Sequence, residues 1–157
     1  MSVRVSVLSA SLVLLAACGP QAEAPTAPEV AAQPAAPECA PSIEVSTENV
    51  ALPPGGCVVS PSGTYALTMK ANGDLELTHT QTEAIVWSSH SSGGLAGSRH
   101  LGIQTDGNLV IYDSASGSAV WASGTIGQSG PFVLRVEDAG VAQYIPQDRQ
   151  PIWSVPQ

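Results

Sequence analysis

Apolar and polar residues alternate in three stretches of the last hundred residues, and a short turn segment with glycine interrupts each stretch. In the middle stretch, Leu101 and Ile103 precede the turn. Two further apolar residues, Leu109 and Ile111, follow it. Alternation with a period of two is typical of a strand with one buried face, so each stretch predicts a β-hairpin. All four residues face one core only if the loop holds an odd number of residues.

A three-residue loop at 105–107 meets this condition and places Gly107 last, where such loops need a left-handed backbone. This loop pairs Ile103 with Leu109 and Leu101 with Ile111. The same register around the turn glycines of the other two stretches predicts four more pairs, namely Met69 with Leu75, Leu67 with Leu77, Val136 with Ala142 and Leu134 with Tyr144.

The hairpins belong to a repeated unit, because their turn glycines are 34 and 33 residues apart. Each unit ends on a tryptophan, and Trp87, Trp121 and Trp153 are 34 and 32 residues apart. Periods in this range mark stacked or radially arranged units. The repeat therefore predicts a threefold all-β domain in which the three tryptophans meet in a shared core.

Composition narrows the class of protein further. The chain has 157 residues, with 5 Lys and Arg against 13 Asp and Glu, and a net charge of −8. This length allows one domain of ordinary size. With Lys70 as its single lysine, the chain lacks the basic surface that phosphate backbones require, so we exclude nucleic acid as a partner. Low charge with abundant Gly, Ser and Thr favours strands over a helical bundle.

Residues 1–17 have the features of a signal peptide, with Arg4 ahead of an apolar stretch at 5–17 that is too short to span a bilayer. The Leu-Ala-Ala-Cys segment that ends at Cys18 resembles the bacterial lipoprotein box, which implies that Cys18 is lipidated and anchors the protein to a membrane. The alternative is an ordinary secretory signal followed by a cysteine. Because Gly19 and not Asp follows, similarity to lipoprotein sorting implies the outer membrane of a bacterial cell envelope.

Residues 18–44 are rich in Ala and Pro and contain no aromatic or basic residue. Such a segment buries too little apolar surface to offset the conformational entropy that it would lose on ordering. It therefore predicts a disordered tether ahead of a folded domain at 45–157. If Cys18 carries lipid, Cys39 and Cys57 remain. An even pair outside the cytoplasm indicates a disulfide, and two independent thiols are the alternative.

The face of the second hairpin opposite the predicted core carries Gln104, Asn108, Val110 and Tyr112, with Asp106 in the loop. This spacing matches the mannose-binding signature of the bulb-type (monocot) lectins, and the Trp-Ser and Trp-Ala endings also look like that family. The resemblance covers the predicted domain. It implies a β-prism II of three four-stranded sheets with pseudo-threefold symmetry, in which each sheet can hold one sugar.

The residue types suit a mannose-type glycan. Gln104, Asp106 and Asn108 supply hydrogen-bond donors and acceptors, Tyr112 adds a phenol, and Val110 offers an apolar contact to the sugar ring. The alternative is that these are solvent-facing residues, with Asp106 and Asn108 serving the turn alone. Gln104 and Tyr112 have no role in a turn, which favours a binding site.

The other two hairpins depart from the signature, and neither keeps the valine or the tyrosine. We therefore expect no mannose-type binding there. The residues at the matching positions are Lys70, Asn72, Asp74, Glu76 and Thr78 in the first hairpin and Glu137, Ala139, Val141, Gln143 and Ile145 in the third.

We find no pattern that indicates catalysis. His79, His90 and His100 have no cysteine near them, so we interpret them as solvated residues and expect no metal and no cofactor. No nucleophile elbow or arrangement of paired carboxylates is present, and the predicted hairpins leave little room for a deep cleft. The sequence predicts a protein that is not an enzyme.

The leading hypothesis is a lipid-anchored lectin of the cell envelope. The alternative is a protein-interaction module of the envelope that keeps a lectin scaffold and has lost sugar binding. A lectin-like bacteriocin is a third, weaker reading, because those toxins usually join two such domains and are released. Family members often dimerise by exchanging a C-terminal strand, but four residues follow Trp153, so we expect a monomer or weak dimer.

Overall fold

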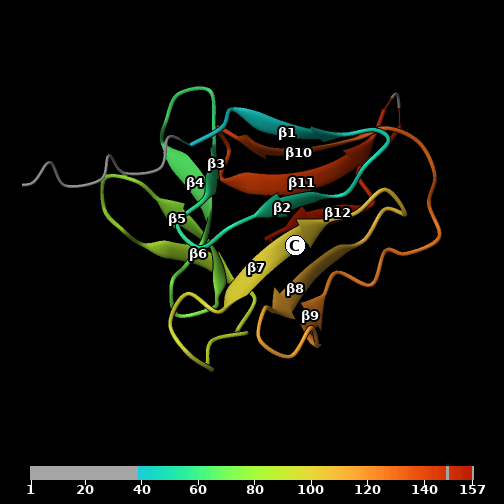
Figure 1. The fold of residues 1–157 in the computed structure, drawn as a ribbon. Helices are drawn as coiled ribbons and strands as arrows, with labels where there is room; N and C mark the ends of the chain where they lie inside the picture. The colour runs from blue at the N-terminus through green and yellow to red at the C-terminus, as the bar shows by residue number, and fades with distance from the viewer. Residues whose placement is uncertain (1–38, 148, 157) are drawn as a thin grey trace, which may run out of the picture. The chain divides into compact units, whose positions relative to one another are not determined.

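The structure is a computed structural model that describes residues 39–147 and 149–156 (Figure 1). The predicted signal peptide, Cys18 and the tether as far as residue 38 lie outside the described residues. Every regular element within the described residues is a β-strand, and the strands form three antiparallel sheets of four. No helix in this part of the chain is long and apolar enough to cross a membrane.

Each repeat contributes three consecutive strands to one sheet, and we number the sheets by the repeats. Sheet 1 contains β4 (Tyr65–Met69), β5 (Leu75–His79) and β6 (Ile85–Ser88). Sheet 2 contains β7 (Arg99–Ile103), β8 (Leu109–Asp113) and β9 (Ala119–Ala122). Sheet 3 contains β10 (Phe132–Glu137), β11 (Val141–Pro146) and β12 (Trp153–Val155).

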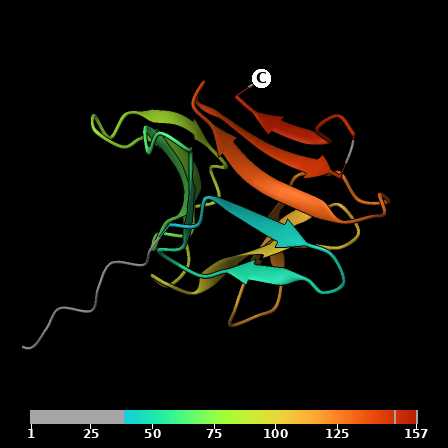
Figure 2. The ribbon, with the colours of Figure 1, turned by 90° about the horizontal axis from the view of Figure 1, so that it is seen from above.

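The fourth strand of every sheet comes from a segment ahead of the first repeat, residues 42–59, which we call the strap. Its strand β1 (Ser42–Val45) pairs with β10, β2 (Val50–Leu52) with β7, and β3 (Cys57–Val59) with β4. The strap thus supplies an edge strand to sheet 3, then to sheet 2, then to sheet 1 (Figure 2).

Strand β1 begins inside the range 18–44 that the sequence predicts as a tether, and its first three residues belong to that range. Ile43 and Val45 point to the same face of this strand, and Val45 is buried in the core while Ile43 packs against it. Residues 42–44 therefore belong to the sheet, because the strand pairs with β10 and its alternate apolar side chains face the core.

All six predicted cross-strand pairs of the hairpins are confirmed. The last loop residue has the expected left-handed backbone in each hairpin, with φ of 93° at Gly73, 88° at Gly107 and 76° at Gly140. A bulge follows in sheets 1 and 2 at the same point, between Leu77 and Thr78 and between Ile111 and Tyr112.

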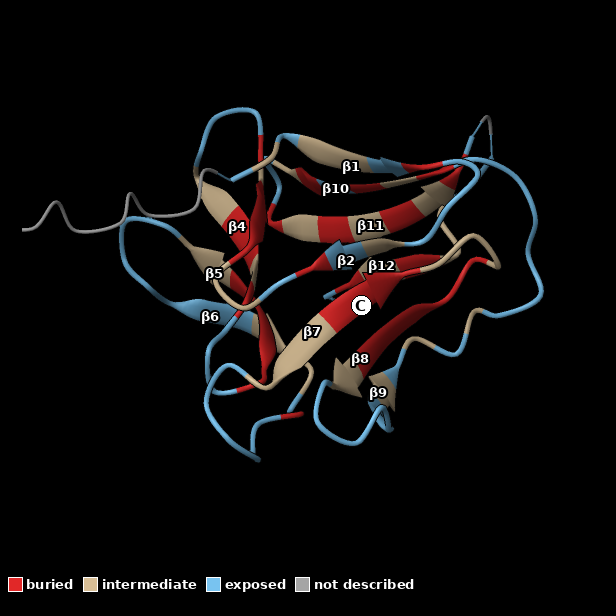
Figure 3. Cartoon of the chain, viewed as in Figure 1, coloured by how far each residue is buried: buried red, intermediate tan, exposed pale blue. Residues whose placement is uncertain are grey.

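The apolar faces of the three sheets meet in one core, and Figure 3 shows buried bands along the strands with exposed loops around them. The rings of Trp87, Trp121 and Trp153 contact one another edge to face, with centroids 5.6–6.3 Å apart. This arrangement is favoured by the ring quadrupoles. The predicted meeting of the three tryptophans is confirmed.

Cys39 and Cys57 form a disulfide, as the sequence predicts. The bridge joins positions 18 residues apart in sequence and encloses β1 and β2. It therefore ties the segment just ahead of the strap to β3 in sheet 1.

Candidate functional site

The five residues of the predicted sugar site lie together on the hairpin between β7 and β8 of sheet 2. Their binding role stays a prediction, but the structure brings them to one face, opposite the buried side chains of the hairpin. Gln104 follows β7, Asp106 is in the loop, Asn108 precedes β8, and Val110 and Tyr112 lie on β8.

Gln104 and Tyr112 form one wall of the site. The Nε2 group of Gln104 donates a hydrogen bond of 3.0 Å to the hydroxyl of Tyr112. The Tyr112 ring also stacks on the His100 ring, with centroids 5.8 Å apart. Both contacts limit the rotation of the Tyr112 side chain, so its hydroxyl oxygen is held in place.

Gly102 is a site residue that the sequence reasoning missed. The Tyr112 ring lies so close to it that an added Cβ would stand 3.1 Å from Cε2 of the ring. A glycine inside a strand marks a close approach of another group, and this signal was present in the sequence. Gly102 therefore makes room for the ring of Tyr112.

Asn108 has a structural role as well as an outward position. Its Oδ1 atom accepts hydrogen bonds from the hydroxyl of Ser123 (3.0 Å) and from the backbone N–H of Thr125 (3.3 Å). Asp106 acts in the turn, where its Oδ1 accepts the N–H of Asn108 at 3.0 Å. These bonds engage Oδ1 of Asn108, and no hydrogen bond within the described residues uses its Nδ2 group.

Sheet 1 contains the same network with different residues. Oδ1 of Asp74 accepts the hydroxyl of Ser89 (3.3 Å) and the backbone N–H of Ser91 (2.5 Å). In sheet 3 the matching pair is apolar, with Val141 at the asparagine position and Val155 at the serine position. Sheets 1 and 2 therefore share this network, and the side-chain amide of Asn108 distinguishes sheet 2 from sheet 1.

Two more features shape the site on sheet 2. Val110 is only 4% exposed, so the predicted apolar contact is a narrow one.

The buried Tyr144 of sheet 3 donates a hydrogen bond of 2.7 Å to the backbone carbonyl of Gln104. Burial raises the pKa of the Tyr144 hydroxyl, and the negative charge of Asp106 raises it further. The phenol thus stays protonated and braces the hairpin from a neighbouring sheet.

The outward face of sheet 3 is occupied by its own side chains. Arg135 stands at the position of Gly102, and its Nη2 group donates hydrogen bonds to Glu137 (2.8 Å) and to Gln143 (3.1 Å). These are two of the residues that match the sugar site of sheet 2. The guanidinium therefore lies against residues that match the sugar site of sheet 2, and the absence of mannose binding there stays a prediction.

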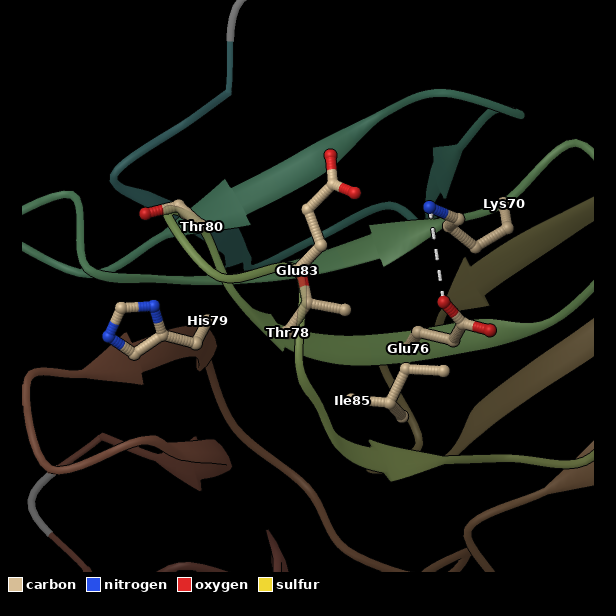
Figure 4. Close-up of a pocket in the computed structure, with 7 residues that line it drawn as sticks. All are labelled: Lys70, Glu76, Thr78, His79, Thr80, Glu83 and Ile85. Carbon is tan, nitrogen blue, oxygen red and sulfur yellow. Dashed lines mark ion pairs between the residues drawn. The ribbon is translucent and has the colours of Figure 1, made fainter.

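The outward face of sheet 1 has a hollow of about 430 Å³ at the matching place (Figure 4). The sequence predicts no mannose-type binding in this hairpin and gives no sign of a hollow. Its lining includes Lys70, Glu76 and Glu83. Among the described residues, no group of three or more His, Cys, Asp or Glu is placed to hold a metal ion.

Comparison with known proteins places the chain among known folds. No protein-family model and no curated protein matches the sequence. A monomeric monocot mannose-binding lectin from Gastrodia elata is 27% identical, with a TM-score of 0.62 over 73% of this chain and 96% of that lectin. The fold is a β-prism II. The predicted fold class is confirmed.

Two other lectin structures agree with this result. A lectin from Allium sativum is 29% identical, with a TM-score of 0.58 over 71% of this chain and 98% of the lectin. The mannose-specific agglutinin of snowdrop, Galanthus nivalis, in complex with methyl-α-D-mannoside is 26% identical, with a TM-score of 0.57 over 71% of this chain and 94% of the agglutinin. The protein therefore has a lectin scaffold.

Proposed function

We propose that the protein is a lipid-anchored lectin of the bacterial cell envelope that binds mannose-type carbohydrate through sheet 2. The observation that carries this proposal is the preformed pair of Gln104 and Tyr112 beside the Nδ2 group of Asn108. The snowdrop agglutinin, which has the same fold, is solved with a mannoside, and this supports the choice of sugar.

The site acts by binding and not by catalysis. A hexose presents several hydroxyls that both donate and accept, and the amides of Gln104 and Asn108 and the phenol of Tyr112 match them. Such a shallow site is weak, and a Kd of about 1 mM corresponds to about 4 kcal/mol. Many copies anchored on one membrane would raise the strength of adhesion through multivalency.

The alternative function is a protein-interaction module that has lost sugar binding. The observation that favours it is the face of sheet 3, where Arg135 covers the matching position. This alternative predicts that sheet 2 also fails to bind sugar, so a binding experiment on sheet 2 separates the two functions.

The experiment uses the full-length protein, purified in a detergent without a sugar headgroup and applied to immobilised mannose. The test variant is Asn108→Asp, since Asp74 shows that aspartate fits the same network in sheet 1. We expect the wild type to be retained and Asn108→Asp and Tyr112→Phe to elute early. The matched control is Asp74→Asn, which makes the reverse change in sheet 1 and should be retained. Lack of retention of the wild type, or equal retention of Asn108→Asp, would refute the proposal.

The anchor and the oligomeric state have their own tests. We expect Cys18→Ala to release the protein from the membrane fraction, and unchanged association would contradict lipidation. Fractionation of the wild type should place it in the outer membrane. Light scattering on the detergent-solubilised chain should give the mass of a monomer, or of a dimer that dissociates on dilution.

A further inference from the structure

The hollow on sheet 1 lies at the pseudo-threefold counterpart of the predicted mannose site, but its chemistry is charged. Lys70 takes the place of Gln104, and Glu76 takes the place of Val110. The hollow has a volume of about 430 Å³, which falls in the range of small-ligand sites. We infer that this hollow is a second carbohydrate site, for a sugar with a free ammonium group such as a 2-amino-2-deoxyhexose.

Glu76 carries the first part of this inference. Its side chain is 12% exposed, and within the described residues its ion-pair partner is Lys70, with 3.9 Å between Nζ and Oε2. That distance is too long for a hydrogen bond, and Lys70 is itself 45% exposed. A carboxylate so far removed from water gains when a charged donor approaches within hydrogen-bond distance.

Glu83 supplies a second carboxylate at an unfavourable backbone position. Its φ is 56°, and its N–H bonds the carbonyl of His79 in the turn after β5. The corresponding turn of sheet 2 has Gly117 at this point, with φ of 71°. A glutamate in the left-handed region is strained where glycine is not, and residues strained in this way cluster at active sites and ligand clamps. Figure 4 shows Glu83 between Thr80 and the Lys70–Glu76 pair.

The remaining lining suits a sugar ring more than a simple cation. Thr78 and Thr80 line the hollow, and the hydroxyl of Thr80 donates a hydrogen bond of 2.7 Å to the carbonyl of Gly63. Ile85 is 60% exposed at the border of the hollow and offers an apolar surface to ring carbons. Glu76 and Glu83 each carry a negative charge and Lys70 carries one positive charge, so the hollow has a net negative charge. This charge favours a positively charged polyol over a neutral or acidic one.

The test is an amide chemical-shift titration of the full-length protein, in a detergent without a sugar headgroup, with glucosamine. N-acetylglucosamine is the matched ligand control, since it keeps the ring and removes the charge. We expect glucosamine to shift the amide signals of β5 and β6. N-acetylglucosamine should bind at least about tenfold more weakly, because it lacks the ammonium that donates a charge-assisted hydrogen bond. Shifts that increase equally with both sugars, or that equal concentrations of lysine amide reproduce, would overturn the inference, as would no shift in sheet 1.

Two variants separate binding from folding. Glu83→Gly removes the carboxylate and adopts the residue of the sheet 2 turn, so it should melt at an equal or higher temperature and lose glucosamine binding. Lys70→Gln removes the competing ammonium and should bind glucosamine more tightly than the wild type. Glu48→Gln changes an exposed carboxylate of the strap and should bind as the wild type does. Unchanged affinity in Glu83→Gly, or weaker binding in Lys70→Gln, would contradict the charge pairing.

Glucosamine binding at sheet 1 can be confirmed or refuted independently of mannose binding at sheet 2. Asn108→Asp should not change glucosamine binding at sheet 1, and Glu83→Gly should not change retention on mannose. If each of these two variants changes the binding of both sugars, the two sites are not separate and the inference is wrong.

Discussion

Reduction of the disulfide between Cys39 and Cys57 is expected to lower the free energy of unfolding by about 3 kcal/mol, because the bridge closes a loop between positions 18 residues apart. The loop contains β1 and β2 and ends where β3 begins. These strands have only three or four residues, and each lies at the edge of a different sheet. Such short strands add little stability on their own, so the constraint from the bridge matters more. A loss of this size is a large share of the about 5–15 kcal/mol that stabilises an ordinary domain.

The assay is denaturant unfolding of the oxidised and the reduced protein, followed by tryptophan fluorescence. Cys39→Ala is the matched variant, because Cys39 is exposed and its replacement breaks the bridge while the buried Cys57 stays. The reduced wild type and Cys39→Ala should have equal stability, both about 3 kcal/mol below the oxidised protein. A difference under about 1 kcal/mol between oxidised and reduced protein would refute the reasoning, since the chain-entropy effect would then be absent.

Three further changes have expected outcomes. Gly102→Ala should weaken mannose binding several-fold with unchanged or increased stability, since the new Cβ displaces the Tyr112 ring; calorimetry and melting curves check both. Tyr144→Phe should lower the free energy of unfolding by about 1 kcal/mol, through loss of one buried hydrogen bond, as measured by denaturant unfolding. Hydrogen bonds from the side chain and backbone of Ser62 lower the pKa of the Asp138 carboxyl. Their stabilisation is present above about pH 4 and is lost as the pH falls through the lowered pKa. Melting curves should therefore show Ser62→Ala less stable than wild type at neutral pH and the gap closing in acid.

The hairpins could be predicted from the sequence because their side chains obey a strict rule. A period of two decides which side chains share the core, and a loop that ends on Gly107 admits one register only. The strap could not be predicted, because β2 and β3 have three residues each and show no periodicity. Which sheet each of them joins depends on tertiary packing, and no local pattern contains that information.

In the candidate site, too, some residues could be predicted from the sequence and others could not. Gln104 and Tyr112 could be identified because they stand at fixed spacing in the chain, on the two sides of the hairpin turn. Ser123 was missed because it lies after the third strand of the repeat and reaches Asn108 only in the folded sheet. The hollow of sheet 1 was missed because its departures from the signature were interpreted as loss of a site and not as a change of ligand charge.

The structure also changes the interpretation of Asn108. The sequence left open whether this residue serves the turn or a ligand. Its Oδ1 atom is committed to Ser123 and Thr125, as the matching atom of Asp74 is committed in sheet 1. Only the Nδ2 group can therefore carry specificity, which is why aspartate is a sharper replacement than alanine.

The most direct test of the central claim is an amide chemical-shift titration of the full-length protein with methyl-α-D-mannoside. The account predicts saturable shifts confined to the hairpin of β7 and β8 and the segment around Ser123, with a Kd on the order of 1 mM. The same titration of Asn108→Asp should show no saturation. Shifts confined to sheet 1 or sheet 3, or no shifts in the wild type, would contradict a mannose site on sheet 2.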